Sequence, residues 1–220
     1  MLLDLHNHTR YSPDSRVEPR ELVALAKKIG LDGIAITDHN AVGGIAYARE
    51  AAGRDFLVLP GIEVSTRDGH VLGYGVRDVV PRDLSAAETV ERIVALGGVP
   101  VAAHPYRFWS GLGERATVSS PFAAYETHNG RTLRRGNQRA RELARGRHVG
   151  ETGGSDSHLL DELAKGITSI NGGPMGADDV LQRIGQGKTT AQGLDRGGAA
   201  TVRYVSKCVG EWIVRGMRRI

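Results

Sequence analysis

The strongest constraint on the fold of this chain is that short apolar runs repeatedly end in clusters of acidic and imidazole side chains. Seven of its eight histidines belong to this pattern. Side chains of one chemistry gather in this way where the carboxyl ends of parallel strands meet at one active face. The clusters are Leu5-His6-Asn7-His8 with Asp14, Thr37-Asp38-His39, Gly61-Ile62-Glu63 with His70, Ala103-His104-Pro105, Glu126-Thr127-His128 and Gly154-Ser155-Asp156-Ser157-His158.

Segments between the clusters alternate between strand-like and helix-like patterns. Apolar residues have helical spacing from Pro19 to Ile29, and Ser85-Ala86-Ala87-Glu88 has the form of a capping box. This alternation predicts an α/β protein with a parallel sheet. The expected strands span residues 2–5, 33–37, 56–60, 71–74, 99–103, 123–127, 149–152 and 188–191, and the expected helices span 19–29, 45–52, 85–96 and 178–184.

Five of the clusters resemble, in unbroken order, the motifs of the PHP (polymerase and histidinol phosphatase) family, over about residues 2 to 192. The resemblance implies a distorted (β/α)7 barrel of the TIM-like kind over residues 1–195. It also implies an enzyme, a metal-dependent phosphoesterase with a trinuclear site. The matching segments are Asp4-Leu5-His6-Asn7-His8-Thr9 with Ser12 and Asp14, Ile36-Thr37-Asp38-His39-Asn40, Gly61-Ile62-Glu63, Ala103-His104-Pro105 and Gly154-Ser155-Asp156-Ser157-His158.

The expected cofactors are two or three divalent transition-metal ions: manganese, zinc or iron. Imidazoles and carboxylates are the ligands of such ions, and Glu63 is the expected bridge because one carboxylate can bind two cations. Asp38 is expected to orient a neighbouring imidazole. The ligand sets that the resemblance implies are His6, His8, Glu63 and Asp156 for one ion, Glu63, His70 and His104 for a second, and Asp14, His39 and His158 for a third.

Residue spacing agrees with this division. His6 and His8 lie two apart on extended backbone, so their imidazoles point the same way. Asp156 and His158 have the same spacing, but a turn expected at 153–155 would let them diverge toward different ions.

The expected nucleophile is a hydroxide bridging two ions, because such ions lower the pKa of bound water to near neutrality. Glu63, His104 and Asp156 are therefore catalytic candidates through the ions they hold. His128 is a fourth candidate, as general acid for the leaving oxygen. A metal-bound water is the alternative acid, and His128 is then a hydrogen-bonded wall residue.

The arginines of the chain indicate the charge of the substrate. Residues 131–147 contain seven arginines against Glu142, whereas the net charge of the whole chain is only +4. Guanidinium groups bind phosphate oxygens in bidentate fashion, which favours a phosphorylated small molecule or nucleotide as substrate. The alternative for this segment is a solvated helix face. The phosphate-binding candidates are Arg107, Arg131, Arg134 and Arg135.

Composition indicates a globular protein. The 220 residues, 40% of them hydrophobic, suffice for one core, and no apolar run reaches the roughly 18 to 20 residues of a membrane helix. The single cysteine, Cys208, and the absence of a signal peptide pattern predict a cytoplasmic protein without a membrane partner. Residues 196–220 are expected to form a linker and a basic amphipathic C-terminal helix, which packs on the barrel or contacts a partner such as nucleic acid.

Two alternatives to a phosphoesterase remain at this stage. One is a catalytically silent metal-binding module that engages nucleic acid, and the other is a metal-dependent amide hydrolase. His70 and His104 are separated by enough chain for one helix and one strand only. The inserted domain of nucleotide phosphatases and exonucleases in the family is thus absent from this compact form, so their specificity cannot be transferred. The sequence leaves the oligomeric state open.

Overall fold

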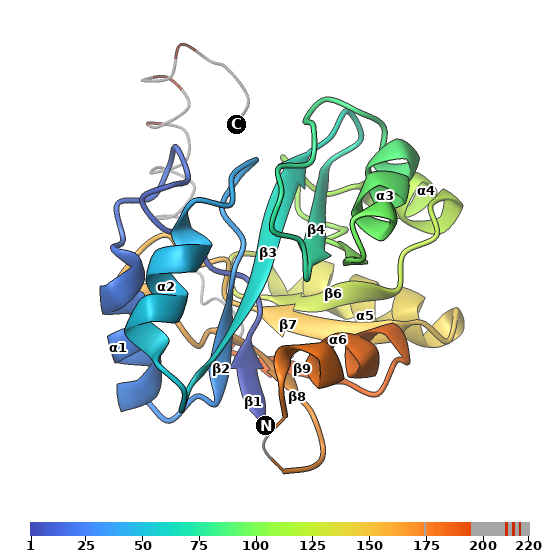
Figure 1. Ribbon diagram of the computed structural model, residues 1–220. Coiled ribbons are helices and arrows are strands. Elements are labelled where there is room, and N and C mark those ends of the chain that lie inside the picture. Colours follow the sequence, from blue (N-terminus) through green and yellow to red (C-terminus); the bar gives the residue numbers. More distant parts are fainter. Residues whose placement is uncertain (174, 195–209, 211–212, 214–215, 217–220) are drawn as a thin grey trace.

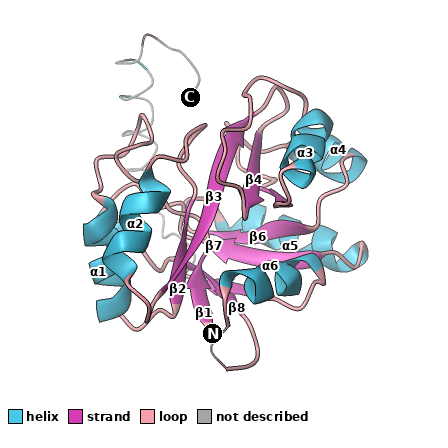
Figure 2. Cartoon of the chain, in the orientation of Figure 1, coloured by secondary structure: helices cyan, strands magenta, loops and turns pink. Residues whose placement is uncertain are grey.

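The computed structural model describes residues 1–173 and 175–194, together with residues 210, 213 and 216 (Figure 1). Helices and strands alternate along most of this length (Figure 2). The helices are α1 (Pro19–Lys28), α2 (Gly44–Ala52), α3 (Ala86–Ala95), α4 (Gly113–Ser119), α5 (Arg134–Gly146) and α6 (Ala177–Gly185), with a 3₁₀ turn at Leu160–Glu162. The strands are β1 (Leu2–Asp4), β2 (Gly33–Ile36), β3 (Leu57–Ser65), β4 (His70–Tyr74), β5 (Val99–Ala102), β6 (Ala124–Asn129), β7 (Gly150–Gly154), β8 (Gly166–Ser169) and β9 (Thr190–Gly193).

The strands form one sheet in the order β7-β6-β5-β4-β3-β2-β1-β8-β9. The sheet curls until its distant parts meet, because Leu5 N donates to Gly153 O (3.4 Å) and Gly153 N donates to Thr168 Oγ1 (2.8 Å). The fold class expected from the sequence, an α/β protein with a barrel-like sheet, is confirmed. The expectation of a purely parallel sheet is wrong for β4 and β8, which run against the seven other strands.

The reversal at β4 has a local cause. Strand β3 continues well past the predicted end and is followed by a tight turn, in which Thr66 N donates to Gly69 O (2.9 Å). So short a connection can join only antiparallel strands. As a result His70, the first residue of β4, lies at the same end of the barrel as the carboxyl ends of the parallel strands.

The helices cover the outside of the sheet, with α1 and α2 beside β2 and α3 beside β4 and β5 (Figure 1). Leu22 and Ala26 of α1 pack with Ile34 and Ile36 of β2 in one apolar cluster. The predicted capping box is confirmed, because Ser85 Oγ accepts a hydrogen bond from Glu88 N at 3.2 Å. Strand β8 and helix α4 were not predicted from the sequence.

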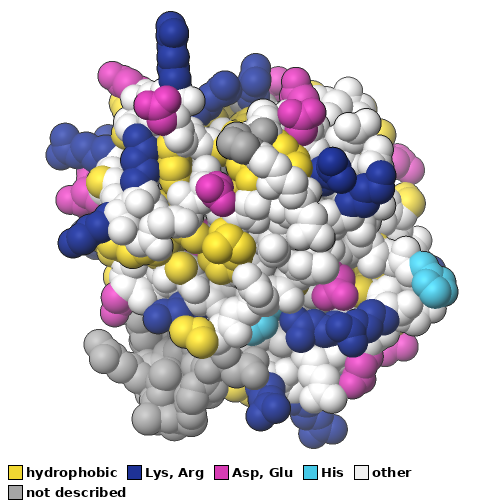
Figure 3. All heavy atoms as spheres, turned by 90° about the horizontal axis from the view of Figure 1, so that it is seen from below, with side chains coloured by type: hydrophobic (Ala, Val, Ile, Leu, Met, Phe, Trp, Pro, Cys, Tyr) yellow, Lys and Arg dark blue, Asp and Glu magenta, His cyan; other side chains and the backbone are white. Residues whose placement is uncertain are grey.

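The predicted linker and C-terminal helix of residues 196–220 lie outside the described residues, except for three single positions. Within the described part of the chain, no helix has the length and apolar character needed to cross a membrane. Seen from below, the surface intersperses acidic and basic side chains and shows little histidine (Figure 3). The histidines of the clusters instead turn inward.

Candidate metal centre

The barrel brings all nine sequence-predicted ligands to one end of the sheet. Strands β1, β2, β3, β5 and β7 deliver theirs near their carboxyl ends, and β4 delivers His70 from its amino end. Eight of the nine side chains are at most 6% exposed, and His70 is 15% exposed. So dense a set of buried ionisable groups is costly unless charge is balanced within it.

Glu63 lies at the centre of the cluster. Its Oε2 is 3.1 Å from Nε2 of both His6 and His8, and 3.3 Å from Nδ1 of His39. Its Oε1 is 2.8 Å from His70 Nδ1 and 2.9 Å from His104 Nε2. One carboxylate therefore faces five imidazoles, divided between its two oxygens.

Asp156 and Asp14 extend the cluster away from Glu63. Asp156 Oδ1 lies 3.4 Å from His8 Nε2, whereas His158 turns toward Asp14, with 2.7 Å between His158 Nε2 and Asp14 Oδ2. The divergence expected of Asp156 and His158 is present, but its expected cause is wrong. Residues 153 and 154 belong to β7, and the backbone changes direction at Asp156, whose φ is 55°.

This left-handed backbone is uncommon for residues other than glycine and costs about 1–3 kcal/mol where the surroundings hold it in place. His104, with a φ of 28°, is a second example at the site. Close backbone contact adds a further requirement, because a Cβ at Gly154 would stand 2.3 Å from the Cβ of His6. The backbone is thus in uncommon conformations or close contact where β1, β5 and β7 carry predicted ligands.

In the part of the chain that the structure describes, three groups of side chains have ligand atoms within 4.8 Å of one another. The first coincides with a predicted set. The second contains His39 in place of His104, although His104 also contacts Glu63 Oε1, and the third adds His8 to the predicted set. The groups are His6, His8, Glu63 and Asp156; His39, Glu63 and His70; and His8, Asp14, His39 and His158.

The donor set fits transition-metal ions. Within the described residues, His8 Nε2 and His39 Nδ1 are buried without a hydrogen-bond partner, although each lies close to Glu63 Oε2. These two ring nitrogens therefore lie near the Glu63 carboxylate without forming a hydrogen bond to it. Imidazole nitrogens and carboxylate oxygens converging in this manner suit zinc, manganese or iron.

The carboxylates and imidazoles of the cluster shift one another's pKa values, and two of them favour the charged form. Burial would raise the pKa of the Glu63 carboxyl, but the charges of His39 and His6 hold it well below its usual range. Burial likewise opposes protonation of His8, yet the nearby carboxylates of Asp156 and Glu63 raise its pKa to about 9. A bound cation would replace such protons, because metal binding to imidazole releases them.

The pKa of His158 is shifted in the opposite direction from that of His8. Burial, together with the charge of Arg131, lowers its pKa to about 4. Its imidazole is therefore neutral at pH 7, which is the form that binds a metal ion. Arg131 Nη1 lies 2.6 Å from His158 Nδ1, so the opposite ring nitrogen, Nε2, is the one turned to Asp14.

Glu126 belongs to one of the sequence clusters, but no role was predicted for it. Its Oε1 is 2.9 Å from His6 Nδ1, and its Oε2 accepts from the backbone N of His104 at 2.8 Å. A carboxylate behind a ligating histidine fixes the orientation of the ring and raises its basicity. Glu126 holds two predicted ligands in this way, one through its ring and one through its backbone.

The role expected for Asp38 is wrong. Its carboxylate accepts hydrogen bonds from Thr9 N (2.6 Å) and Thr9 Oγ1 (2.8 Å) and does not orient an imidazole. Ser12 does contact one, because its Oγ lies 3.3 Å from His8 Nδ1. A serine in a sequence does not indicate that it contacts a histidine ring. Asp38, next to His39, suggested such a contact but forms its hydrogen bonds with Thr9.

The candidate phosphate-binding arginines fall into two pairs. Arg107 forms an ion pair with Asp156, and Arg131 Nη1 lies 3.7 Å from Asp156 Oδ1. Arg134 and Arg135 are exposed in the first turn of α5. His128 is buried in β6, and a Cβ added to Gly193 of β9 would stand 2.4 Å from its Nε2.

The PHP domain family matches residues 4–192, so the chain belongs to that family. It is 38% identical over 127 residues to an uncharacterised protein of Methanocaldococcus jannaschii, covering 52% of this chain and 74% of the relative. It is 30% identical over 158 residues to the 5'-3' exoribonuclease Rnm of Salmonella typhimurium, covering 57% of this chain and 54% of the enzyme. This chain thus spans about half the length of that exoribonuclease.

A solved two-domain protein of Bacteroides vulgatus, described as containing a predicted PHP-like metal-dependent phosphoesterase, shares the fold. Its TM-score is 0.74 at 18% identity, over 92% of this chain and 68% of that one. The family assignment and the compact form are confirmed, since α3 alone separates β4 from β5. The enzyme class expected from the sequence, a metal-dependent hydrolase of phosphate esters, is confirmed at the level of the family.

Proposed function

We propose that this chain hydrolyses a phosphomonoester or a nucleotide-type phosphoester at a site that holds up to three divalent transition-metal ions. The observation that carries the proposal is the position of Glu63, whose two oxygens face five imidazoles from four strands or strand ends. A bridging carboxylate has this arrangement, and a purely structural buried glutamate does not require it. The bound ions supply an activated water at neutral pH and offset charge on the phosphoryl group.

The protein's own residues hold and separate the reacting groups. Glu63 would hold one ion together with His6 and His8, and a second together with His70 and His104. His39, His158 and Asp14 hold the third ion in this proposal, with His8 near enough to share in it. Burial of these side chains excludes bulk water, which strengthens each charge interaction.

Arg107 and Arg131 are the groups proposed to bind the phosphate. Both lie beside Asp156 and offset its charge. Cations bound to Asp156 would take over that function and leave guanidinium N–H groups for phosphate oxygens, which they bind in bidentate geometry. For His128 we propose the role of a wall residue, because its ring packs against β9.

The test is a metal analysis of the purified protein together with an activity panel. The panel contains sugar phosphates, histidinol phosphate, nucleotides, short oligonucleotides and an amide substrate, each assayed before and after chelation. Hydrolysis of a phosphate ester that is lost with the metal supports the proposal. A fully loaded protein that turns over no ester but binds oligonucleotides would instead be a silent module, and cleavage of the amide alone would make it an amide hydrolase.

A further inference from the structure

Two aromatic side chains lie in solvent directly beside Arg107. Phe108 is 87% exposed and Trp109 is 62% exposed, and their rings meet edge to face with centroids 4.6 Å apart. The chain has only three phenylalanines and two tryptophans. Leaving one of each in water, next to one another, forgoes apolar burial that would stabilise the fold.

The segment that carries this pair is tied to the metal centre at both ends. Arg107 N donates to His104 O (2.9 Å), and the guanidinium group of Arg107 pairs with Asp156. At the other end, Ser110 O accepts from the backbone N of His70 at 3.0 Å. Gly111 N then closes the turn on Arg107 O at 3.0 Å.

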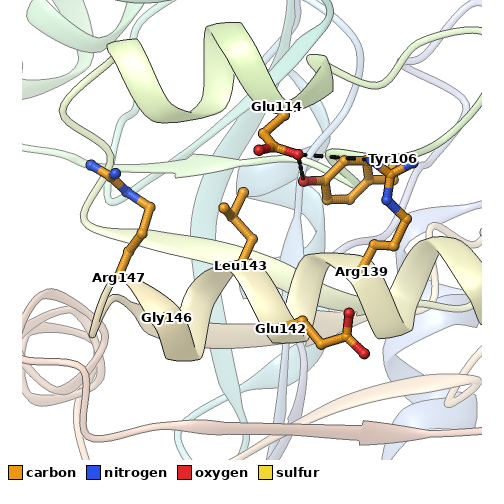
Figure 4. Close-up of a pocket in the computed structure, with 7 residues that line it drawn as sticks. All are labelled: Tyr106, Glu114, Arg139, Glu142, Leu143, Gly146 and Arg147. Carbon is orange, nitrogen blue, oxygen red and sulfur yellow. Dashed lines mark hydrogen bonds and ion pairs between the residues drawn. The ribbon is translucent and has the colours of Figure 1, made fainter.

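Tyr106 anchors the same segment from the side. Its hydroxyl donates to Glu114 of α4 at 3.0 Å, and the guanidinium of Arg139 from α5 lies 4.2 Å from its ring centroid. These groups line an open groove of about 370 Å³ between the two helices (Figure 4). The aromatic pair is therefore presented on a turn held from three directions, at the rim of the site.

We propose that Phe108 and Trp109 form a stacking platform for a nucleobase, so that the substrate is a nucleotide or the end of a single-stranded nucleic acid rather than a sugar phosphate. This inference rests on the proposed function, because Arg107 is taken to bind the phosphate of the same molecule. Consecutive Cα atoms are about 3.8 Å apart, so the platform begins one residue from that arginine. The proposal requires one ligand to contact both.

The chemistry of the turn favours a planar polar ligand over a protein partner. Protein interfaces place their aromatic anchors in a wider apolar patch. Here the neighbours along the chain are Tyr106, Arg107, Ser110 and Gly111. Isolated aromatic faces beside a cation are the arrangement on which bases stack, and stacking contributes about 1–3 kcal/mol per base.

The experiment compares two esters that share a phosphate and a ribose, adenosine 5'-monophosphate and ribose 5-phosphate, in the metal-loaded enzyme. The Phe108→Ala/Trp109→Ala variant should lose roughly 5- to 100-fold in kcat/KM for the nucleotide and change less than twofold for ribose 5-phosphate. Trp109→Tyr should retain most of the activity on the nucleotide. The control is Ile29→Ala, an exposed apolar side chain at the end of α1, which should change neither.

An equal loss on both esters would overturn the platform, because the turn would then only position Arg107. Unchanged kinetics on both would overturn it as well. Fluorescence separates these results from failure of the proposed function. In a Trp212→Phe background Trp109 is the sole tryptophan, and adenosine 5'-monophosphate should quench it while ribose 5-phosphate does not, whether or not either is hydrolysed. Absence of quenching by the nucleotide would contradict the inference.

Discussion

The two ends of the histidine cluster are built differently. Glu63 is 1% exposed, lies in a strand paired on both sides, and faces five imidazoles. Asp14 is 6% exposed, lies in the loop between β1 and α1, and has two imidazoles within 4 Å of its carboxylate, at 2.7 Å (His158) and 3.9 Å (His39). Sites built on strands are positioned more accurately than sites built on loops. We therefore expect tightly held ions at the Glu63 end and a more readily exchanged ion at the Asp14 end.

Replacing Glu63 by Gln should have the largest effect. The amide cannot act as a bridging anion between two ions, so both metal stoichiometry and phosphoesterase activity should be lost. Metal analysis by mass spectrometry and a turnover assay measure the two quantities. Glu91→Gln, the same change on the exposed face of α3, is the matched control. Undiminished metal content in the Glu63 variant would disprove the bridging role.

Substitutions at the Asp14 end should reduce the metal content only in part. Asp14→Asn or His158→Ala should remove one ion and leave two, because neither side chain belongs to the other two groups of converging ligands. The same metal analysis gives the count, and a melting curve checks that the fold is retained. Simultaneous loss of all ions would show that the Asp14 end and the Glu63 end do not bind metal independently.

Replacing Glu126, which lies behind the predicted ligands His6 and His104, should weaken metal binding without abolishing it. Glu126→Gln keeps an acceptor for His6 but removes the negative charge behind it and presents an NH₂ group to the backbone N of His104. Outer carboxylates of this kind typically contribute about 10- to 100-fold in metal affinity. Activity titrated against added Mn²⁺ should shift by that factor and recover at saturating metal. An unchanged titration curve would mean that Glu126 only fills space.

The sequence predicted which side chains converge at one end of the sheet, because the signal is local. A short apolar run followed by His or Asp defines a strand end without knowledge of the sheet. The direction of a strand in the sheet was harder to predict. Strand β4 is antiparallel to β3 because β3 extends to Ser65 and a tight turn follows. Strand β8 is four residues long and reads Gly-Ile-Thr-Ser, which is too short for a reliable pattern.

The different surroundings of Glu126 and His128 could not be predicted either. On a regular strand, residues two apart point to the same face. The register between β6 and β7 shifts between these two residues, so that Glu126 reaches His6 while His128 packs against Gly193. A bulge of this kind depends on the pairing of two strands, which a single sequence does not reveal.

The smallest expected effect concerns Arg134 and Arg135, which are exposed in the first turn of α5. If they bind substrate phosphate in addition to Arg107 and Arg131, changing both to Ala should raise KM for a phosphomonoester and leave metal content and melting temperature nearly unchanged. A hydrogen bond to a charged group contributes about 1.5–3 kcal/mol, so kcat/KM should fall roughly tenfold or more.

The matched control is Arg145→Ala/Arg147→Ala, which removes the same charge at the far end of α5. A similar loss in the control would indicate long-range attraction of the anion rather than contact with it. If oligonucleotide affinity and its salt dependence fall while small-substrate kinetics stay constant, the segment binds nucleic acid instead. Unchanged behaviour in both assays would identify a solvated helix face. Among the described residues, Arg107 and Arg131 would then remain the phosphate-binding candidates, because both lie beside Asp156.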